Sequence, residues 1–177
     1  IRRLHGVPLV SLVGSVLSRC DFVDRAIVST DHKEIATLAL ESGLDCPFYR
    51  PEHLSGDRIG DIDVLTHALK EVERSDNCRY DIILMLQPTS PFRTVKHIRD
   101  VVELIVDNSV DSVWTLSPTD SKGHPDKQLI VREGKIDYYS ENAASIVARQ
   151  ELKPTYHKNG VAYAMSRECI LEKKNIK

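Results

Sequence analysis

A short apolar run that ends in a proline-bearing polar turn is the feature that most constrains the fold of this 177-residue chain. The run Ile82–Met85 is followed at once by the sequence LQPTSPFRT, residues 86–94. Proline cannot continue a central strand, so Pro88 and Pro91 predict that a buried strand ends here in a turn of fixed backbone. In an open α/β sheet, ligands bind beyond the carboxyl ends of the strands. The turn is therefore the first candidate for a ligand-binding segment.

The apolar pattern around this run alternates between the periods of strands and helices. Strands are expected near residues 26–28, 82–86 and 112–116, and helices near 9–20, 34–43, 61–72 and 95–105. Asp31 and Glu34 have the spacing of a capping box for the second of these helices. Strands that alternate with right-handed helical crossovers predict an α/β fold with three layers, Rossmann-like, around a mainly parallel sheet.

The pattern changes after Asp111, because the strand expected at 112–116 is not followed by another long helix. Two apolar stretches, residues 128–131 and 136–139, flank the turn 133–135 and predict a β-hairpin. A strand is expected again at 160–165 and a last helix at 167–173. We therefore expect a single domain over residues 1–177 with an excursion at about 121–157, which is a candidate flap or small dimerisation arm.

Composition narrows the class of protein. With 41% hydrophobic residues the chain can bury one core, and its net charge of −2 disfavours a nucleic-acid-binding protein. No apolar run approaches the length of a membrane span. The four cysteines form no CxxC pair, so we expect reduced thiols, a cytoplasmic protein and no zinc site.

The side chains of the turn suit a polar ligand. Gln87 offers an amide, Thr89 and Ser90 offer hydroxyls, and Arg93 offers a cationic fork for a phosphate or carboxylate. The alternative is that Thr94 and its neighbours only end the strand and cap the next helix. We expect that alternative to hold for Thr94 and ligand contact to hold for Gln87.

Four motifs together make the chain recognisable. Besides LQPTSPFRT these are VSTD at 28–31, YRPEHLSGD at 49–57 and KNGVAY at 158–163. In this order they resemble the cytidylyltransferases that activate nine-carbon acidic sugars, the CMP-sialic acid (acylneuraminate) synthetases. The resemblance implies a nucleotidyltransferase fold and an enzyme that binds CTP and Mg²⁺. The anomeric hydroxyl of a sialic, legionaminic or pseudaminic type of sugar would attack the α-phosphate and release pyrophosphate. Positioning and charge neutralisation, rather than a covalent protein nucleophile, would drive such a step.

The resemblance also implies roles for individual residues on the nucleotide side. Arg50 matches a nucleotide-binding arginine, and its alternative is a surface salt bridge. Asp61 matches a polar position near the ribose, and a solvated carboxylate in a first helical turn is an equally good explanation. Asp31 belongs to a turn that faces the nucleotide in the family, although a helix cap is the stronger expectation for it.

On the sugar side the resemblance implies a mainly polar set, in which Arg149 is the first choice for the sugar carboxylate because arginine binds carboxylates in a bidentate manner. The set is Gln87, Thr89, Ser90, Arg93, Lys127, Arg149, Lys158, Asn159 and Tyr163. A solvated loop cation is the alternative for Arg149. No residue is assigned as a catalytic nucleophile or a metal ligand.

The family's triphosphate loop would precede Ile1 and its metal-binding D-x-D would follow Lys177, so both are expected outside residues 1–177. The resemblance further implies a homodimer whose arm helps to close the partner's sugar site. Two alternatives stay open. One is a non-catalytic nucleotide-sugar-binding or regulatory module of the same fold, and the other is a cytidylyltransferase for another acidic sugar such as 3-deoxy-manno-octulosonate.

Overall fold

β7 (Tyr156–Ser166) is the middle strand of a sheet whose order is β3-β7-β4. The computed structural model describes residues 1–173, and the chain divides into two compact units, residues 1–115 with 160–177 and residues 116–159. The boundary between the units falls within β7 and within β4 (Ser112–Pro118). Each unit is described by itself below.

The neighbours of β7 both run antiparallel to it. β3 (Ile82–Met85) pairs with β7 in antiparallel register. On the other side the Ser166 N–H donates to the Asp111 carbonyl at 2.9 Å. The Thr115 hydroxyl donates to the Ala162 carbonyl and accepts the Ala162 N–H. Because the later residue of β7 meets the earlier residue on the β4 side, this pairing also runs in opposite directions. The prediction of a mainly parallel sheet is therefore wrong for these three strands. It fails because the chain enters β7 from the 116–159 segment rather than from a crossover helix.

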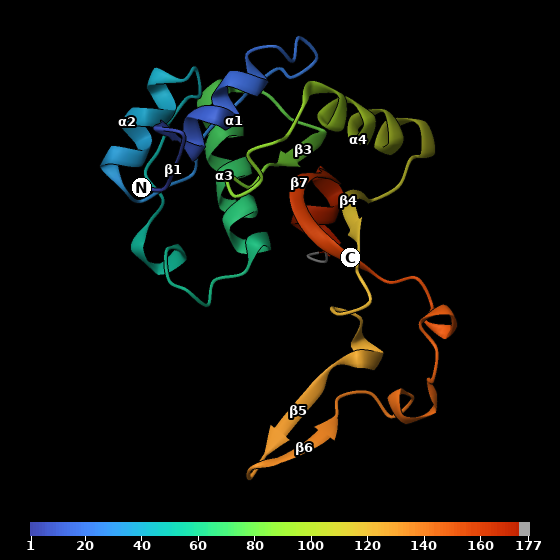
Figure 1. Ribbon diagram of the computed structural model, residues 1–177. Helices are drawn as coiled ribbons and strands as arrows, with labels where there is room; N and C mark the ends of the chain where they lie inside the picture. Colours follow the sequence, from blue (N-terminus) through green and yellow to red (C-terminus); the bar gives the residue numbers. More distant parts are fainter. Residues whose placement is uncertain (174–177) are drawn as a thin grey trace. The chain divides into compact units, whose positions relative to one another are not determined.

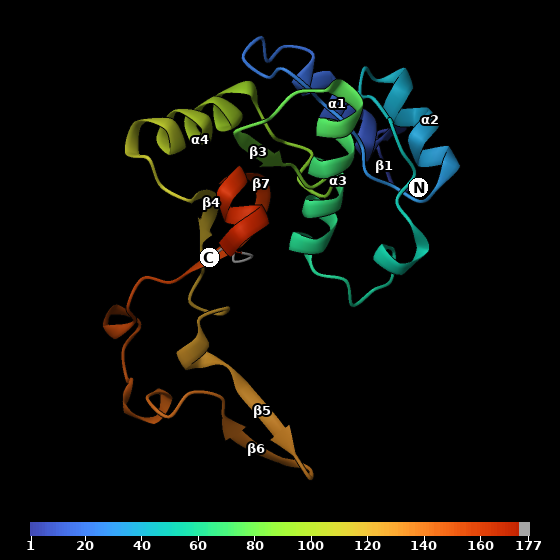
Figure 2. The same ribbon diagram turned by 180° about the vertical axis from the view of Figure 1, so that it is seen from behind.

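Helices cover both faces of this sheet, which confirms the predicted α/β fold (Figure 1, Figure 2). On one face Leu69 of α3 (Asp61–Asp76) packs with Tyr163 and Met165. On the other face Val101 and Ile105 of α4 (Val95–Asn108) pack with Ala162 and Ala164. Successive residues of a strand point to opposite faces, and β7 uses both faces because it is buried between two helices.

A second apolar cluster lies at the amino-terminal part of the first unit. α1 (Leu9–Leu17) and α2 (Lys33–Glu41) pack through Val10 and Ala39, together with Leu44. The expected strand at 26–28 is reduced to a single parallel bridge between Ile27 and Asp45. The remaining short elements of this unit are β1 (Arg3–Leu4), β2 (Val7–Pro8), η1 (Glu52–Leu54) and η5 (Cys169–Lys173).

The predicted capping box of α2 is wrong. The residue that precedes the helix is His32, whose side chain makes no capping hydrogen bond. Thr30 takes part of that task, because its Oγ accepts the His32 N–H at 3.1 Å. Asp31 is thereby left to face outward from the turn, and it lies 3.7 Å from the guanidinium of Arg50.

The second unit contains the expected hairpin. β5 (Leu129–Arg132) pairs with β6 (Lys135–Tyr138) in antiparallel register, and both turn residues, Glu133 and Gly134, have positive φ, as a two-residue hairpin turn requires. Short 3₁₀ turns complete the unit: η2 (Pro125–Lys127), η3 (Ala143–Ser145) and η4 (Arg149–Glu151). Over residues 1–173, none of the helices combines the length and the apolar character needed to cross a bilayer.

Candidate active site

The turn after β3 is held in place by hydrogen bonds at both of its ends. The Ser90 N–H donates to the Gln87 carbonyl at 3.2 Å, which closes the turn. At its far end Thr94 caps α4: its Oγ accepts the His97 N–H, and His97 Nδ1 accepts the Thr94 N–H. The expectation for Thr94 is confirmed, with histidine in place of the usual acidic partner of a capping box.

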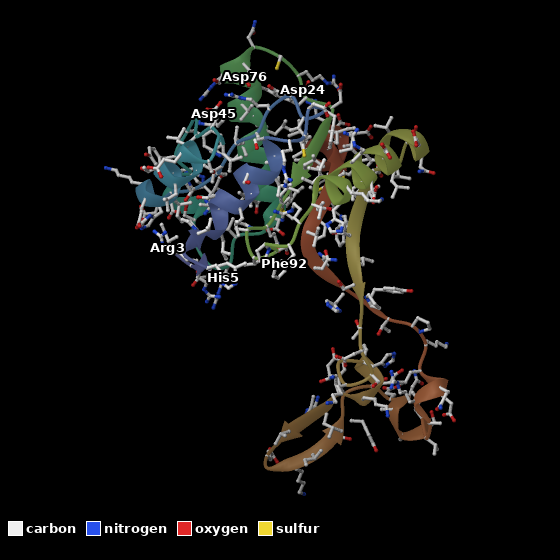
Figure 3. All side chains as sticks on the ribbon, turned by 45° about the horizontal axis from the view of Figure 1, so that its top comes forward. Arg3, His5, Asp24, Asp45, Asp76 and Phe92 are labelled. Atoms are coloured by element: carbon white, nitrogen blue, oxygen red, sulfur yellow. The ribbon has the colours of Figure 1, made fainter. Side chains whose placement is uncertain are left out.

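The tip of the turn is open to solvent. Thr89 is exposed, and Phe92 is 83% exposed. Figure 3 shows Phe92 at the same end of the unit as Arg3 and His5 and well away from Asp45 and Asp76. At that remote end Arg25 forms ion pairs with Asp45 and Asp76.

Arg93 does not point toward solvent, as a substrate-binding role would require. Its side chain is 5% exposed, and its guanidinium donates to the carbonyls of Gln87 at 2.7 Å, Gly160 at 3.0 Å and Val161. Burial lowers the pKa of Arg93 to about 10, which leaves it protonated at neutral pH. A buried cation costs several kcal/mol unless polar groups surround it, and here backbone carbonyls do so. The expectation that Arg93 binds substrate is corrected to a structural role.

Gly160 lies directly against the candidate sugar contact, Gln87. A Cβ built on Gly160 would lie 2.4 Å from Gln87 Oε1 and 3.0 Å from Ser90 Oγ. Its φ of +70° also favours glycine. Only a residue without a side chain lets the Gln87 amide occupy this place, so Gly160 belongs to the site although it offers no functional group.

Tyr163 is likewise not free to face a sugar. Its side chain is 4% exposed, and its ring packs against that of Trp114 with the two ring centroids 5.5 Å apart. Its hydroxyl accepts the Gly160 N–H at 2.7 Å. The expectation of a substrate contact is corrected, since β7 turns this side chain into the core on the α3 face. The same alternation buries Ala162 and Ala164 against α4.

A cavity of about 950 Å³ lies within the first unit beside β3. Both Asp81 and Gln87 border it, so it extends along the whole length of the strand. Most of its wall is aliphatic, from α1, α3 and β3. The polar and charged residues that border it are Asp24, Arg25, Ser29, Arg50, Ser55, Asp61, Arg79, Asp81 and Gln87.

Three of the residues expected in the site, Arg50, Asp61 and Gln87, therefore border one cavity. Arg50 is fixed by its own contacts, because its N–H donates to the Thr30 carbonyl at 2.9 Å and its Nε donates to Ser55 Oγ at 3.3 Å. Asp61 is exposed and is the first residue of α3, which also agrees with the alternative explanation that it is a solvated carboxylate in a first helical turn. Asp31 does not line the cavity but pairs with Arg50 at its border.

Ser29 and Ser55 border the cavity and were not expected from the sequence. Ser29 directly follows the apolar stretch 26–28 and belongs to the VSTD motif, so its position after a strand was an available signal. Ser55 gave no such signal, because its place depends on how Arg50 folds back over η1. Its Oγ both accepts from Arg50 Nε and donates to the Pro51 carbonyl.

The other basic and polar residues expected at the sugar belong to the second unit. Lys127, Arg149 and Lys158 are exposed there. Asn159 donates from Nδ2 to Ser117 Oγ at 3.1 Å. Arg50 and Gln87 belong to the first unit. The roles of these four residues at the sugar stay predictions.

Ionisable groups elsewhere in the first unit do not suggest a covalent nucleophile. Burial raises the pKa of the thiols of Cys20, Cys46 and Cys169, which makes them less reactive at neutral pH. Within residues 1–173 no three His, Cys, Asp or Glu side chains gather as a metal site would need. The groups that the cavity offers to a ligand include the cation of Arg50, the amide of Gln87 and the hydroxyls of two serines.

Comparisons with known proteins agree on one family. The cytidylyltransferase family profile matches residues 1–176. The CMP-N,N'-diacetyllegionaminic acid synthase of Legionella pneumophila is 32% identical over 98% of this chain and 73% of its own length. The N-acylneuraminate cytidylyltransferase of Streptococcus agalactiae is 30% identical over 84% of this chain and 34% of its own length.

Two further comparisons extend this result. The pseudaminic acid cytidylyltransferase of Campylobacter jejuni is 25% identical over 94% of this chain and 71% of its own length. A solved structure of CMP:2-keto-3-deoxy-manno-octonic acid synthetase complexed with CTP matches with a TM-score of 0.65 at 16% identity, over 97% of this chain and 72% of that one. The latter likeness is one of fold. The resemblance drawn from the four motifs is confirmed.

Proposed function

The chain belongs to the cytidylyltransferase family, and from this premise we propose that it transfers CMP from CTP to the anomeric hydroxyl of a nine-carbon 2-keto sugar acid. The match of the family profile to residues 1–176 carries the proposal. The names of the relatives from Legionella, Streptococcus and Campylobacter support a sugar acid of the legionaminic, neuraminic or pseudaminic type.

In the proposed reaction the hydroxyl oxygen of the sugar forms a bond to the α-phosphorus and loses its proton. The bond from that phosphorus to the bridging oxygen breaks, and pyrophosphate leaves. Such a displacement depends on alignment of the two oxygens and on stabilisation of charge. The arrangement of positioning groups around the cavity suits this kind of chemistry.

We propose that Arg50 faces the nucleotide and Gln87 faces the sugar. Arg50 is held by Thr30 and Ser55 at the border of the cavity, and its cation suits a phosphate or a carbonyl of the base. Gln87 stands at the carboxyl end of β3, against Gly160. Asp61 is assigned as a further contact of the nucleotide, and Thr89 and Ser90 as further contacts of the sugar.

We further propose that the protein uses Mg²⁺, acts as a homodimer and works in the cytoplasm. Mg²⁺ would supply charge neutralisation at the phosphates. Because the residues that the structure describes hold no cluster of three candidate ligands, we assign the ion to none of them. The homodimer is supported by the exposed apolar side chains of the β5–β6 hairpin, and Lys127, Arg149, Lys158 and Asn159 are proposed to serve the sugar acid from the second unit.

The test is pyrophosphate release by the full-length protein with CTP, Mg²⁺ and a panel of sugar acids. The panel holds legionaminic, pseudaminic and N-acetylneuraminic acids and 3-deoxy-manno-octulosonate. We expect release with at least one of the nine-carbon acids, and a loss of about 100-fold in kcat/KM for that acid in Gln87→Ala. Folded protein that binds CTP but releases no pyrophosphate with any acid would contradict the proposal and favour a non-catalytic module.

A further inference from the structure

Arg93 is hydrogen-bonded to the main chain of Gln87, which lies in the same turn. The guanidinium of Arg93 donates to the Gln87 carbonyl at 2.7 Å and, through the same Nη2, to the Gly160 carbonyl at 3.0 Å. Its Nε donates to the Val161 carbonyl. One buried side chain thus connects the main chain of the candidate sugar contact with β7 at Gly160 and Val161, which lie 67 and 68 residues from Arg93 in sequence.

The peptide groups on either side of Gly160 are held from several sides. Its carbonyl accepts from Arg93 and from the Gln87 N–H at 3.2 Å, and its N–H donates to the hydroxyl of Tyr163 at 2.7 Å. Gly160 in turn packs directly against the Gln87 side chain, because a Cβ on Gly160 would lie 2.4 Å from Gln87 Oε1. The place of the Gln87 amide therefore depends on Gly160, and that of Gly160 on Arg93 and Tyr163.

The chemistry of Arg93 fits the task of holding these main-chain carbonyls. Among the ion pairs of residues 1–173 none includes Arg93, so a carboxylate is not what fixes it. A planar guanidinium can direct separate N–H groups at separate carbonyls, which a lysine ammonium on its flexible stem cannot match. A neutral side chain would leave the carbonyls without these donors.

We infer that Arg93 is a positioning residue for sugar recognition: by holding Gly160 and the Gln87 backbone, it fixes the Gln87 amide where the sugar acid binds. Tyr163 supports the same arrangement through the Gly160 N–H. The inference rests on the proposed function for its substrate, but the geometry of Gln87 can be measured without any turnover. Arg93 acts through Gln87 and has no contact with CTP in this assignment.

The first experiment is a kinetic cycle in the full-length protein with Arg93→Lys, Gln87→Ala and the double variant. We expect Arg93→Lys to raise KM for the sugar acid or lower kcat by about tenfold, and to leave KM for CTP within about twofold. In the Gln87→Ala background, Arg93→Lys should cost less than about twofold. Equal losses for both substrates, or additive losses in the double variant, would overturn the inference.

Lys96→Met is the matched control. Lys96 is a cation three residues further along, on the exposed surface of α4, where it pairs with Asp100. Its replacement should change neither Michaelis constant. If Arg93→Lys does not fold, Tyr163→Phe replaces it in the cycle, because that change removes only the hydroxyl that holds the Gly160 N–H. Tyr163→Phe is expected to show the same selective effect on the sugar in smaller size, and equal kinetics with the unchanged protein would then count against the inference.

A second readout separates this inference from the proposed function. The side-chain amide of Gln87, assigned by NMR through its disappearance in Gln87→Ala, should give one sharp pair of signals in the unchanged protein. In Arg93→Lys, or in Tyr163→Phe in its place, that pair should shift and broaden, while it stays in place in Lys96→Met. An inactive protein with this response would refute the proposed activity alone, whereas an unaltered Gln87 signal in an active protein would refute the role of Arg93.

Discussion

The two units of the chain are stabilised by different means. In the first unit, apolar clusters fill both faces of the β3-β7-β4 sheet, and Met165 and Ile98 are completely buried. In residues 116–159, all of them described, only His124 and Ala143 are buried. The apolar side chains of the hairpin are left outside: Val131 is 71% exposed and Ile136 is 70% exposed. The first unit can be stable by its own burial, whereas the second has apolar surface to offer to a partner.

His124 shows what takes the place of an apolar core in the second unit. Its Nδ1 accepts the Asp126 N–H at 3.1 Å, so its proton is on Nε2, which donates to the Lys153 carbonyl at 2.8 Å. Ser140 adds a hydrogen bond to Asp126 at 2.6 Å. These bonds connect the two sides of the unit through a few polar contacts, and each of them is worth less than a buried apolar side chain.

The largest expected effect comes from the core of the first unit. Met165→Ala should lower the free energy of unfolding by about 3 kcal/mol, because it removes a fully buried side chain and leaves a cavity between β7 and α3. The matched change Ile136→Ala in the hairpin should alter it by less than about 0.5 kcal/mol at a protein concentration where the chain is monomeric. Urea denaturation followed by circular dichroism measures both. Similar losses in the two variants would contradict the distinction between the units.

The hairpin should instead determine association. Val131→Ser combined with Ile136→Ser should raise the dissociation constant of the proposed dimer by about tenfold or more, since both changes remove exposed apolar area from one surface. Sedimentation equilibrium over a range of concentrations gives the constant. Leu104→Ser, at a 50% exposed position on α4, serves as the control. An unchanged constant in the hairpin variant would remove the support for the arm as a dimer contact.

His124→Ala should weaken the second unit alone. The change leaves the Asp126 N–H and the Lys153 carbonyl without their described partner, at a cost of about 1 kcal/mol of local stability. Hydrogen exchange followed by mass spectrometry should show faster exchange in peptides from 122–130 and 150–155. Peptides from α3, α4 and β3 should exchange as before. Faster exchange throughout the chain would mean that the two units unfold as one.

The smallest expected effect is a pH dependence that belongs to the first unit. Arg167 donates to Glu73 at 2.8 Å, and this hydrogen bond holds the pKa of the Glu73 carboxyl below its usual value of 4.5. Because the pKa is lowered in the folded state, the pair stabilises the fold above pH 4.5, and that contribution is lost as the pH falls through the lowered value. Glu73→Gln should therefore make the stability curve flatter in this acid range. An identical slope in both proteins would contradict the assignment.

Several parts of the fold could be predicted from local sequence. The strand Ile82–Met85, the Thr94 cap and the hairpin turn at Glu133 and Gly134 all depend on residues close to one another in the chain. The antiparallel position of β7 between β3 and β4 could not be predicted, because the hydrophobic periodicity of a strand does not indicate which other strands it will pair with. The capping box of α2 was also predicted wrongly, because the helix begins one residue later than expected and Thr30, not Asp31, accepts the His32 N–H.

The candidate site shows the same limit. The sequence predicts Gln87 just after a strand, which the structure confirms, although that strand is half-buried at the edge of the sheet rather than fully buried. It could not tell that Arg93 and Tyr163, which have suitable chemistry for a sugar acid, would be satisfied by main-chain groups of Gly160. The sequence does not show whether a cationic or hydroxyl side chain faces solvent or a buried carbonyl or N–H, because this depends on which distant segments pack together.

β3 is an edge strand of the described sheet, and the cavity lies beside it. An edge of this kind, next to aliphatic walls, is a template to which a further extended polypeptide can add by main-chain hydrogen bonds. Association through this edge would use main-chain groups of the first unit, whereas the proposed dimer contact uses apolar side chains of the second unit. Aggregates that grow with concentration and persist in the hairpin double variant would indicate association through β3 rather than through the hairpin.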